Sequence, residues 1–143
     1  MFPYPEVLDE DQSETLRMLV DPTEKFFENE YDALKFDADE TVDAETTAKL
    51  GEMGAFGMQV PEKYNGVGLN NTQYARMGEI IGANDLGLGI FTGAHQSIGF
   101  KGILIAGNEE QKAKYLPKLA TGENIAAFAL TEPSSGSDAN SIR

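Results

Sequence analysis

The sequence predicts a mainly α-helical protein, a bundle of about six helices followed by a single β-strand. Three observations support this fold class. Apolar residues recur at helical spacing along most of the chain. Aspartate or asparagine residues that can cap a helix precede several of these segments. One continuous apolar run, residues 125–130, has the length of a strand and turn residues on both sides.

The first part of the chain predicts three helical segments and one loop. A helix is expected over about residues 9–20, because Asp9 can accept hydrogen bonds from its first turn. A second helical segment is expected over 21–30, because it opens on an Asp-Pro pair that suits a helix start. Residues 32–42 are polar and predict a loop, and 43–54 predict a helix between an aspartate and a glycine.

The second part predicts an ordered loop and three further helices. Residues 57–69 are rich in turn-forming Gly, Asn and Pro and predict the loop. A helix is expected from Asn71, which can cap it, and a long helix over about 86–106. Asn108 with Gln111 three residues later matches a capping box, so a short helix is expected to start there.

These elements suggest two unequal domains. Residues 1–124 are predicted to form an N-terminal helical domain, and 143 residues suffice for one domain with a real core. Residues 125–143 are predicted to begin a second, β-type domain that is truncated here. The strand expected over 125–130 has no predicted partner, and an isolated strand is not stable. We therefore expect this chain to be a fragment.

Charge and composition exclude several functions. The net charge is −13, and residues 1–62 supply it with 17 acidic and 4 basic side chains, whereas 63–143 carry 7 of each. The acidic half repels nucleic acid and anionic lipid. The excess of acidic side chains in residues 1–62 is explained either by solvated helix faces or by a docking surface for a basic partner. The chain has no cysteine and one histidine, His95, which argues against a disulfide framework and a zinc site.

The sequence shows neither a secretory signal nor a membrane span. The N-terminus has no basic and apolar leader, and it is too acidic for a transit peptide, so any such segment is absent or already removed. Residues 3–5 predict an extended lead-in because two of them are proline. The stretch 86–107 contains several glycines together with His95 and Lys101, so a transmembrane helix is not expected.

The loop after the predicted strand could bind an anion. Pro133 ends the strand, and Ser134, Ser135, Gly136 and Ser137 follow it, all small enough to let a ligand approach the backbone. A positive φ at Gly136 would turn successive N–H groups toward a phosphate or pyrophosphate. A plain turn explains the same residues, and composition does not separate the two interpretations.

Two features of the predicted long helix also have alternative explanations. Gly89, Gly93 and Ser97 are spaced four apart and share one face. Either they permit close helix packing, or the missing side chains leave a groove for a ligand. His95 lies among small and apolar residues, which favours a hydrogen-bonded core histidine over a catalytic one.

Taken together, the motifs resemble one enzyme family. The run from Phe128 to Asp138 is similar to the flavin-binding signature of acyl-CoA dehydrogenases. Segments 54–61, 71–76, 93–99 and 110–120 also resemble this family, so the resemblance covers essentially the whole chain. Within the family, the chain is most similar to the very-long-chain members, including the lead-in at its N-terminus.

The resemblance implies a fold and a reaction. The fold is the N-terminal helical bundle of the acyl-CoA dehydrogenase fold plus the first strand of its middle β domain. These enzymes use FAD to oxidise acyl-CoA to trans-2-enoyl-CoA in fatty acid β-oxidation. A glutamate removes the α proton, and the flavin N5 accepts the β hydride. The implied partners are long-chain or very-long-chain acyl-CoA, electron-transfer flavoprotein and a second copy of the enzyme. The implied location is the matrix side of the mitochondrial inner membrane, through a C-terminal region absent here.

The resemblance also assigns site residues. Those implied to bind FAD are Phe128, Ala129, Leu130, Thr131, Glu132, Pro133, Ser134, Ser135, Gly136 and Ser137. The Leu130 main chain and the Thr131 hydroxyl would face the flavin pyrimidine edge, and Gly136 and Ser137 the pyrophosphate. Ser137 would also contact acyl-CoA, and Gly89 and Gly93 are candidates for the acyl groove.

No catalytic residue is expected in this chain, because the family's base lies downstream. We therefore expect these residues alone to be inactive and to bind FAD weakly or not at all. A paralogue that acts mainly as an assembly factor for respiratory complex I is the alternative. A helical interaction module that has lost its flavin chemistry is a third interpretation.

Overall fold

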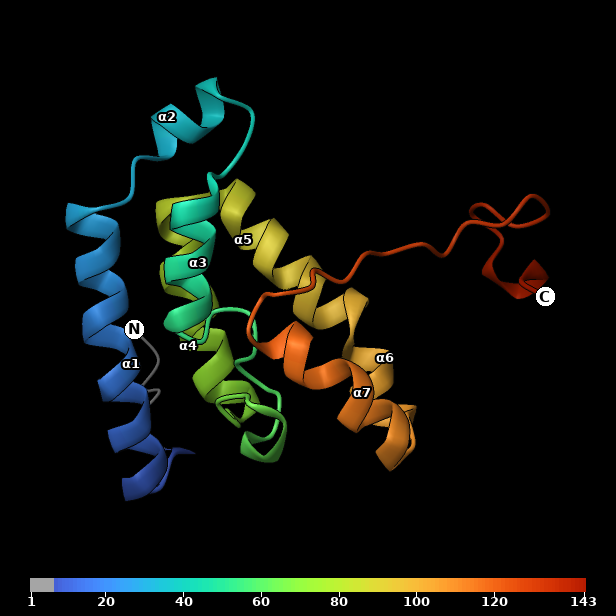
Figure 1. Ribbon diagram of the computed structural model, residues 1–143, viewed down its shortest axis with the longest axis horizontal. Helices are drawn as coiled ribbons and strands as arrows, with labels where there is room; N and C mark the ends of the chain where they lie inside the picture. Colours follow the sequence, from blue (N-terminus) through green and yellow to red (C-terminus); the bar gives the residue numbers. More distant parts are fainter. Residues whose placement is uncertain (1–6) are drawn as a thin grey trace.

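The computed structural model describes residues 7–143, and it shows a helical bundle from which the C-terminal segment extends (Figure 1). The helices are α1 (Glu10–Asn29), α2 (Ala33–Ala38), α3 (Ala44–Glu52), α4 (Asn71–Asn84), α5 (Leu86–Gly93), α6 (Lys101–Ala106) and α7 (Glu109–Ala120). A π-helical turn, η3 (Ala94–Gly99), joins α5 to α6, and the 3₁₀ turns are η2 (Glu62–Tyr64) and η4 (Ala139–Ser141). The predicted mainly α fold class is confirmed. The lead-in expected at residues 3–5 lies outside the described residues.

Polar side chains start the helices largely where the sequence predicts. Asp9, Asp43 and Asn108 each accept a hydrogen bond from the backbone N–H three residues later, at 2.8 Å. The cap of α4 differs by one residue from the prediction. Asn70, not Asn71, accepts the hydrogen bond from the first turn, at 3.0 Å, because the glutamine that completes its capping box lies three residues after it.

Helix α1 runs without a break through Pro22, so the predicted division at residues 21–22 is wrong. Proline inside a helix removes one hydrogen bond and costs about 3 kcal/mol. Leu16 lies before this point and Phe26 and Phe27 after it, and all three are buried in one core cluster. Burial of this continuous apolar face offsets the cost of the proline.

The predicted loop over 32–42 contains helix α2. Asp32 caps it by accepting a hydrogen bond from the Lys35 backbone N–H at 3.0 Å. Phe36 is buried, and its ring lies 5.1 Å from that of Tyr31. One aromatic contact with Tyr31, just after the C-cap of α1, therefore stabilises a helix of 6 residues, which is too short to be recognised from its apolar spacing.

The predicted long helix over 86–106 is divided into α5, η3 and α6. The π-helical turn changes the helical register, and it contains two consecutive polar side chains that are buried, His95 and Gln96. Both bond to backbone groups outside this stretch, within residues 55–58 and 119–126. Apolar spacing along the chain does not report such contacts with distant segments.

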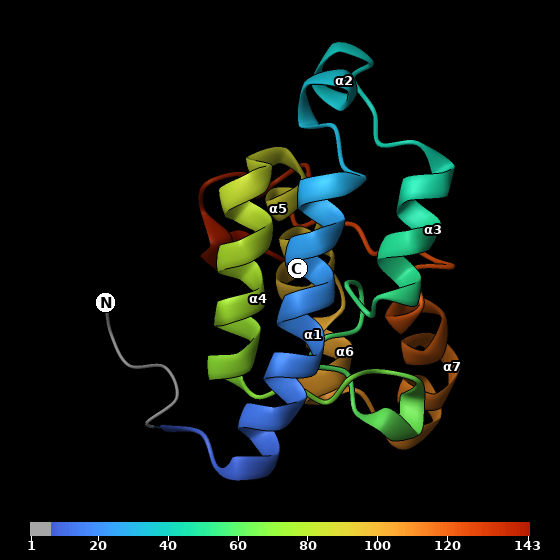
Figure 2. The ribbon, with the colours of Figure 1, turned by 90° about the vertical axis from the view of Figure 1, so that its left-hand side faces the viewer.

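Two buried clusters form the core. The larger one lies between α1, α3, α4 and α5, and Figure 2 shows α1 with α4 on one side and α3 on the other. The smaller one joins η2 to α7 and contains Val60, Phe100 and Leu116. Over residues 7–143, none of the helices combines the length and the apolar character needed to cross a membrane.

The C-terminal segment leaves the bundle after α7. The strand predicted over residues 125–130 is extended backbone without strand pairing, because the described part of the chain offers it no partner strand. The segment projects away from the helices, as the red trace in Figure 1 shows. The division into residues 1–124 and 125–143 stays a prediction.

Candidate functional site

The terminal loop is closed by its own hydrogen bonds. Glu132 and Ser135 exchange two backbone hydrogen bonds of 3.0 Å, which form a turn around Pro133 and Ser134. The Ser135 hydroxyl donates to the Asp138 carbonyl at 2.5 Å, and Ser135 is 2% exposed. This serine therefore shapes the loop, and its hydroxyl proton is already donated.

The remaining small residues of the loop face solvent. Ser134, Gly136 and Ser137 are exposed, and a Cβ built on Gly136 would meet no atom within 4 Å. The positive φ considered for Gly136 does not occur, because among the glycines of residues 7–143 only Gly54, Gly68 and Gly122 have one. The internal hydrogen bonds close the turn without a left-handed residue. The loop thus offers access to its backbone without the predicted nest conformation.

The backbone before this loop has free hydrogen-bonding groups. Within residues 7–143, the N–H and C=O groups of 128–131 make no hydrogen bond to other protein groups. The Phe128 and Leu130 side chains are 56% and 48% exposed. Exposed apolar side chains beside unpaired peptide groups can contact a flat, polar-edged molecule or a neighbouring strand. The sequence-predicted residues 128–137 are therefore contiguous and accessible, apart from the Ser135 hydroxyl.

The glycines of α5 behave differently from one another. A Cβ on Gly89 would lie 3.2 Å from the Gly82 Cα of α4, so this glycine permits close helix packing. A Cβ on Gly93 would meet no atom within 4 Å. The Ser97 hydroxyl has no free proton for a ligand, because it donates to the Gly93 carbonyl at 2.7 Å. The packing explanation thus applies to Gly89, whereas open space lies beside Gly93, and a groove for a ligand there stays a prediction.

A small pocket lies between α4 and α5 beside these glycines. It is lined by Met58, Tyr74, Gly78, Ile81, Gly89, Thr92, Gly93 and Gln96. The Thr92 hydroxyl donates to the Leu88 carbonyl at 2.9 Å, so it presents mainly its methyl group. Such a lining suits an apolar chain better than a charged group.

His95 is a buried, fully hydrogen-bonded histidine, as predicted. It is 1% exposed. Its Nδ1 accepts a hydrogen bond from the Ala126 N–H at 2.9 Å, and its Nε2 lies 2.9 Å from the Leu119 carbonyl. Because a carbonyl can only accept, the proton is on Nε2 and the ring is neutral. Burial lowers the pKa of His95 below its ordinary value, in agreement with a neutral ring.

Gln96 was not singled out from the sequence, although it holds the loop that runs under α5. Its Oε1 accepts from the Met58 N–H, and its Nε2 donates to the Ala55 carbonyl, both at 2.9 Å. The signal in the sequence is a His-Gln pair within an otherwise apolar and glycine-rich stretch. Two adjacent polar residues there must find partners when buried.

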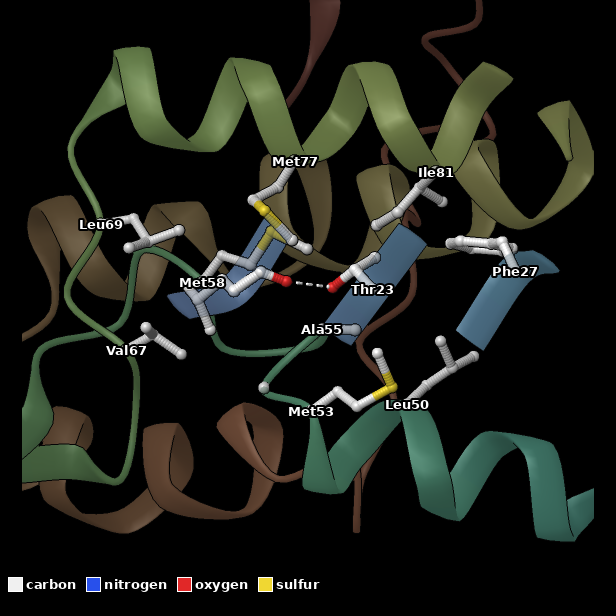
Figure 3. A pocket seen from close by; sticks show the side chains of 12 residues that line it. Thr23, Phe27, Leu50, Met53, Ala55, Met58, Val67, Leu69, Met77 and Ile81 are labelled. Atoms are coloured by element: carbon white, nitrogen blue, oxygen red, sulfur yellow. Dashed lines mark hydrogen bonds between the residues drawn. The ribbon is translucent and has the colours of Figure 1, made fainter. Parts of the chain in front are cut away.

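A second pocket lies inside the bundle and is almost entirely apolar (Figure 3). Met53, Met58 and Met77 contribute thioether side chains to its wall. Its one polar side chain is Thr23, whose hydroxyl donates to the Leu19 carbonyl at 2.7 Å. This pocket offers no group that could hold a phosphate or a metal ion, so its chemistry is confined to apolar contact.

Comparison with known protein families shows which family this helical bundle and its C-terminal loop belong to. The sequence profile described as "Acyl-CoA dehydrogenase, N-terminal domain" matches residues 13–123. The chain belongs to the acyl-CoA dehydrogenase family. This N-terminal domain is 64% identical over 143 residues to the very long-chain specific acyl-CoA dehydrogenase, mitochondrial, of Bos taurus, and 62% identical to that of Homo sapiens. All of this chain is covered, but only 22% of the length of either relative.

The acyl-CoA dehydrogenase domain also has a similar solved structure. It matches the crystal structure of an acyl-CoA dehydrogenase complexed with FAD from Bacillus anthracis with a TM-score of 0.78 and 42% identity. That match covers 95% of this chain and 23% of the other. The helical bundle of the acyl-CoA dehydrogenase fold, predicted from the resemblance, is confirmed.

Proposed function

We propose that this chain is the N-terminal helical domain of an FAD-dependent very-long-chain acyl-CoA dehydrogenase of fatty acid β-oxidation. The observation that carries the proposal is 64% identity across all 143 residues to a relative with that name. The relative is mitochondrial, so we infer a mitochondrial location, with the matrix side of the inner membrane as the finer assignment. Electron-transfer flavoprotein as electron acceptor and a homodimer for the whole protein are part of the same proposal.

The accessible backbone at the C-terminus fits an FAD site. We define residues 128–137 as the flavin wall. The free peptide groups near Leu130 and the exposed Thr131 would hold the flavin pyrimidine edge, and Gly136 and Ser137 the pyrophosphate. When bound, FAD supplies a hydride acceptor for the acyl β carbon. Ser137 would also contact acyl-CoA, whereas Ser135 maintains the turn.

The whole function is tested by mixing the complete, purified protein with acyl-CoA of increasing chain length. Anaerobic bleaching of the flavin absorbance by very long chains, and electron transfer to electron-transfer flavoprotein, are the expected results. A protein whose flavin no acyl-CoA reduces would contradict the proposal and favour the complex I assembly paralogue. A protein without flavin would contradict it and favour the helical interaction module.

A substitution at Gly136 tests whether the flavin wall binds FAD. In the complete protein, Gly136→Val is expected to weaken FAD binding by about tenfold, because the side chain would occupy space that the pyrophosphate approaches. Stability should not change, since a Cβ at this position meets no protein atom within 4 Å. Flavin fluorescence titration and thermal unfolding measure the two effects. An unchanged FAD affinity would remove Gly136 from the proposed site.

A substitution at Gly93 tests whether the acyl chain lies in the pocket between α4 and α5. Gly93→Leu is expected to shorten the acyl chain that the complete enzyme prefers, because leucine would fill the pocket between α4 and α5. Gly102→Leu in α6 is the matched control, since its Cβ position is also open but lies outside this pocket. The ratio of kcat/KM for long and short substrates is the measurement. The same ratio in both variants would exclude a groove at Gly93.

A further inference from the structure

We propose that His95 is a positioning residue that sets where the flavin wall begins. The inference rests on the proposed function, because it concerns the same site. His95 lies in η3, immediately after the helix that contains Gly93, and its Nδ1 accepts a hydrogen bond from the Ala126 N–H, two positions before Phe128. It therefore connects the helix beside the proposed groove to the start of the wall.

The Ala126 hydrogen bond is the last one from the bundle to the departing chain. Asn124 donates to the Lys118 carbonyl at 3.0 Å, and Ala126 then donates to His95 at 2.9 Å. Between residues 127–143 and the rest of the described chain there is no further hydrogen bond. The direction in which the wall leaves the bundle is thus set at Ala126.

The histidine ring is held so that it can define this direction. Its centroid lies 5.5 Å from that of Phe56 and 4.9 Å from that of Phe100, both in edge-to-face geometry. Because Nε2–H donates to the Leu119 carbonyl, Nδ1 carries no proton and is an acceptor that points in one fixed direction. A ring fixed on three sides can accept from only one position of the Ala126 N–H.

The backbone around the ring admits the segment at the same point. A Cβ on Gly99 would lie 2.7 Å from the Ala126 Cβ, so only glycine lets Ala126 approach the π-helical turn this closely. The contact with Gly99 and the hydrogen bond to His95 thus place the same residue. Gly99 leaves room for Ala126 beside η3, and the hydrogen bond from the Ala126 N–H to His95 sets which residue of the departing segment lies there.

Two substitutions separate this positioning role from general stability. In His95→Asn, the side-chain oxygen takes the place of Nδ1 and keeps the acceptor for Ala126. In His95→Gln, the longer amide keeps the donor for Leu119 but presents no acceptor at the Nδ1 position. Both lose the aromatic ring and one hydrogen bond, so we expect similar losses of thermal stability.

The two variants are expected to differ at the cofactor. In the complete protein, His95→Gln should bind FAD about tenfold more weakly than His95→Asn. In the same proteins, hydrogen exchange at the Ala126 amide should be faster in the Gln variant than in the Asn variant. Equal FAD affinities, or equal exchange at Ala126, would overturn the positioning role. Wild-type protein that binds no FAD would instead overturn the proposed function, and the exchange rates would still test the hydrogen bond.

Discussion

Replacing Phe56 with alanine is expected to lower the free energy of unfolding by about 3–5 kcal/mol. Phe56 is 0% exposed, and its ring makes edge-to-face contacts with Phe91 and His95 at 5.8 and 5.5 Å. It also packs against Gly122, where an added Cβ would collide with the ring. Truncation would leave a cavity where the helices and the segment after α7 meet, and the backbone there cannot readily close it.

Chemical denaturation measures this loss, with Phe128→Ala as the control. Phe128 is 56% exposed, so its truncation should change the unfolding free energy by less than about 0.5 kcal/mol. The pair compares the same substitution inside the core and on the flavin wall. Similar unfolding midpoints for Phe56→Ala and wild type would contradict the packing described for this core.

Gly66→Ala is expected to cost about 3 kcal/mol, near the upper end of the usual effect of overpacking. A Cβ on Gly66 would collide with the carbonyl oxygen, the carbonyl carbon and the Cβ of Val60. Val60 is fully buried, and its carbonyl also accepts from the Gly68 N–H at 2.9 Å. Because the clash involves backbone on both sides, neither group can move without breaking the turn.

The matched control is Gly102→Ala in α6, where a Cβ meets no atom within 4 Å. There the change should be neutral or stabilising by up to about 1 kcal/mol, because alanine has the higher helix propensity. Thermal unfolding of both variants compares the same added methyl group in two environments. Equal melting temperatures would show that the loop over 57–69 relaxes around the added atom.

This loop matters for the site as well as for stability. Met58, within it, donates its N–H to Gln96 of η3 and lines both the pocket between α4 and α5 and the pocket inside the bundle. A displaced loop would therefore disturb the π-helical turn that holds His95. We expect Gly66→Ala to weaken the Ala126 hydrogen bond indirectly, through Gln96.

Local chemistry explains the parts of the fold and site that the sequence predicts correctly. The helix starts at Asp9, Asp43 and Asn108 depend on one side chain and the N–H three residues away. The buried role of His95 follows from its apolar neighbours. The small residues of the flavin wall are contiguous in the chain, so their proximity needs no tertiary contact. Their role in binding FAD stays a prediction.

Only tertiary structure determines the other features, because they depend on residues far apart in the sequence. The course of α1 through Pro22 is decided by burial against other helices. The strand predicted over 125–130 lacks pairing because pairing needs a partner strand. Sequence spacing treats Gly89 and Gly93 alike, whereas the neighbouring helix approaches only the first. Local sequence patterns therefore suffice for the family resemblance, for the helix starts at Asp9, Asp43 and Asn108, and for the run of small residues after Pro133. Packing decides which glycine of α5 lies against α4 and which nitrogen of His95 accepts the Ala126 N–H, because both contacts join distant parts of the chain.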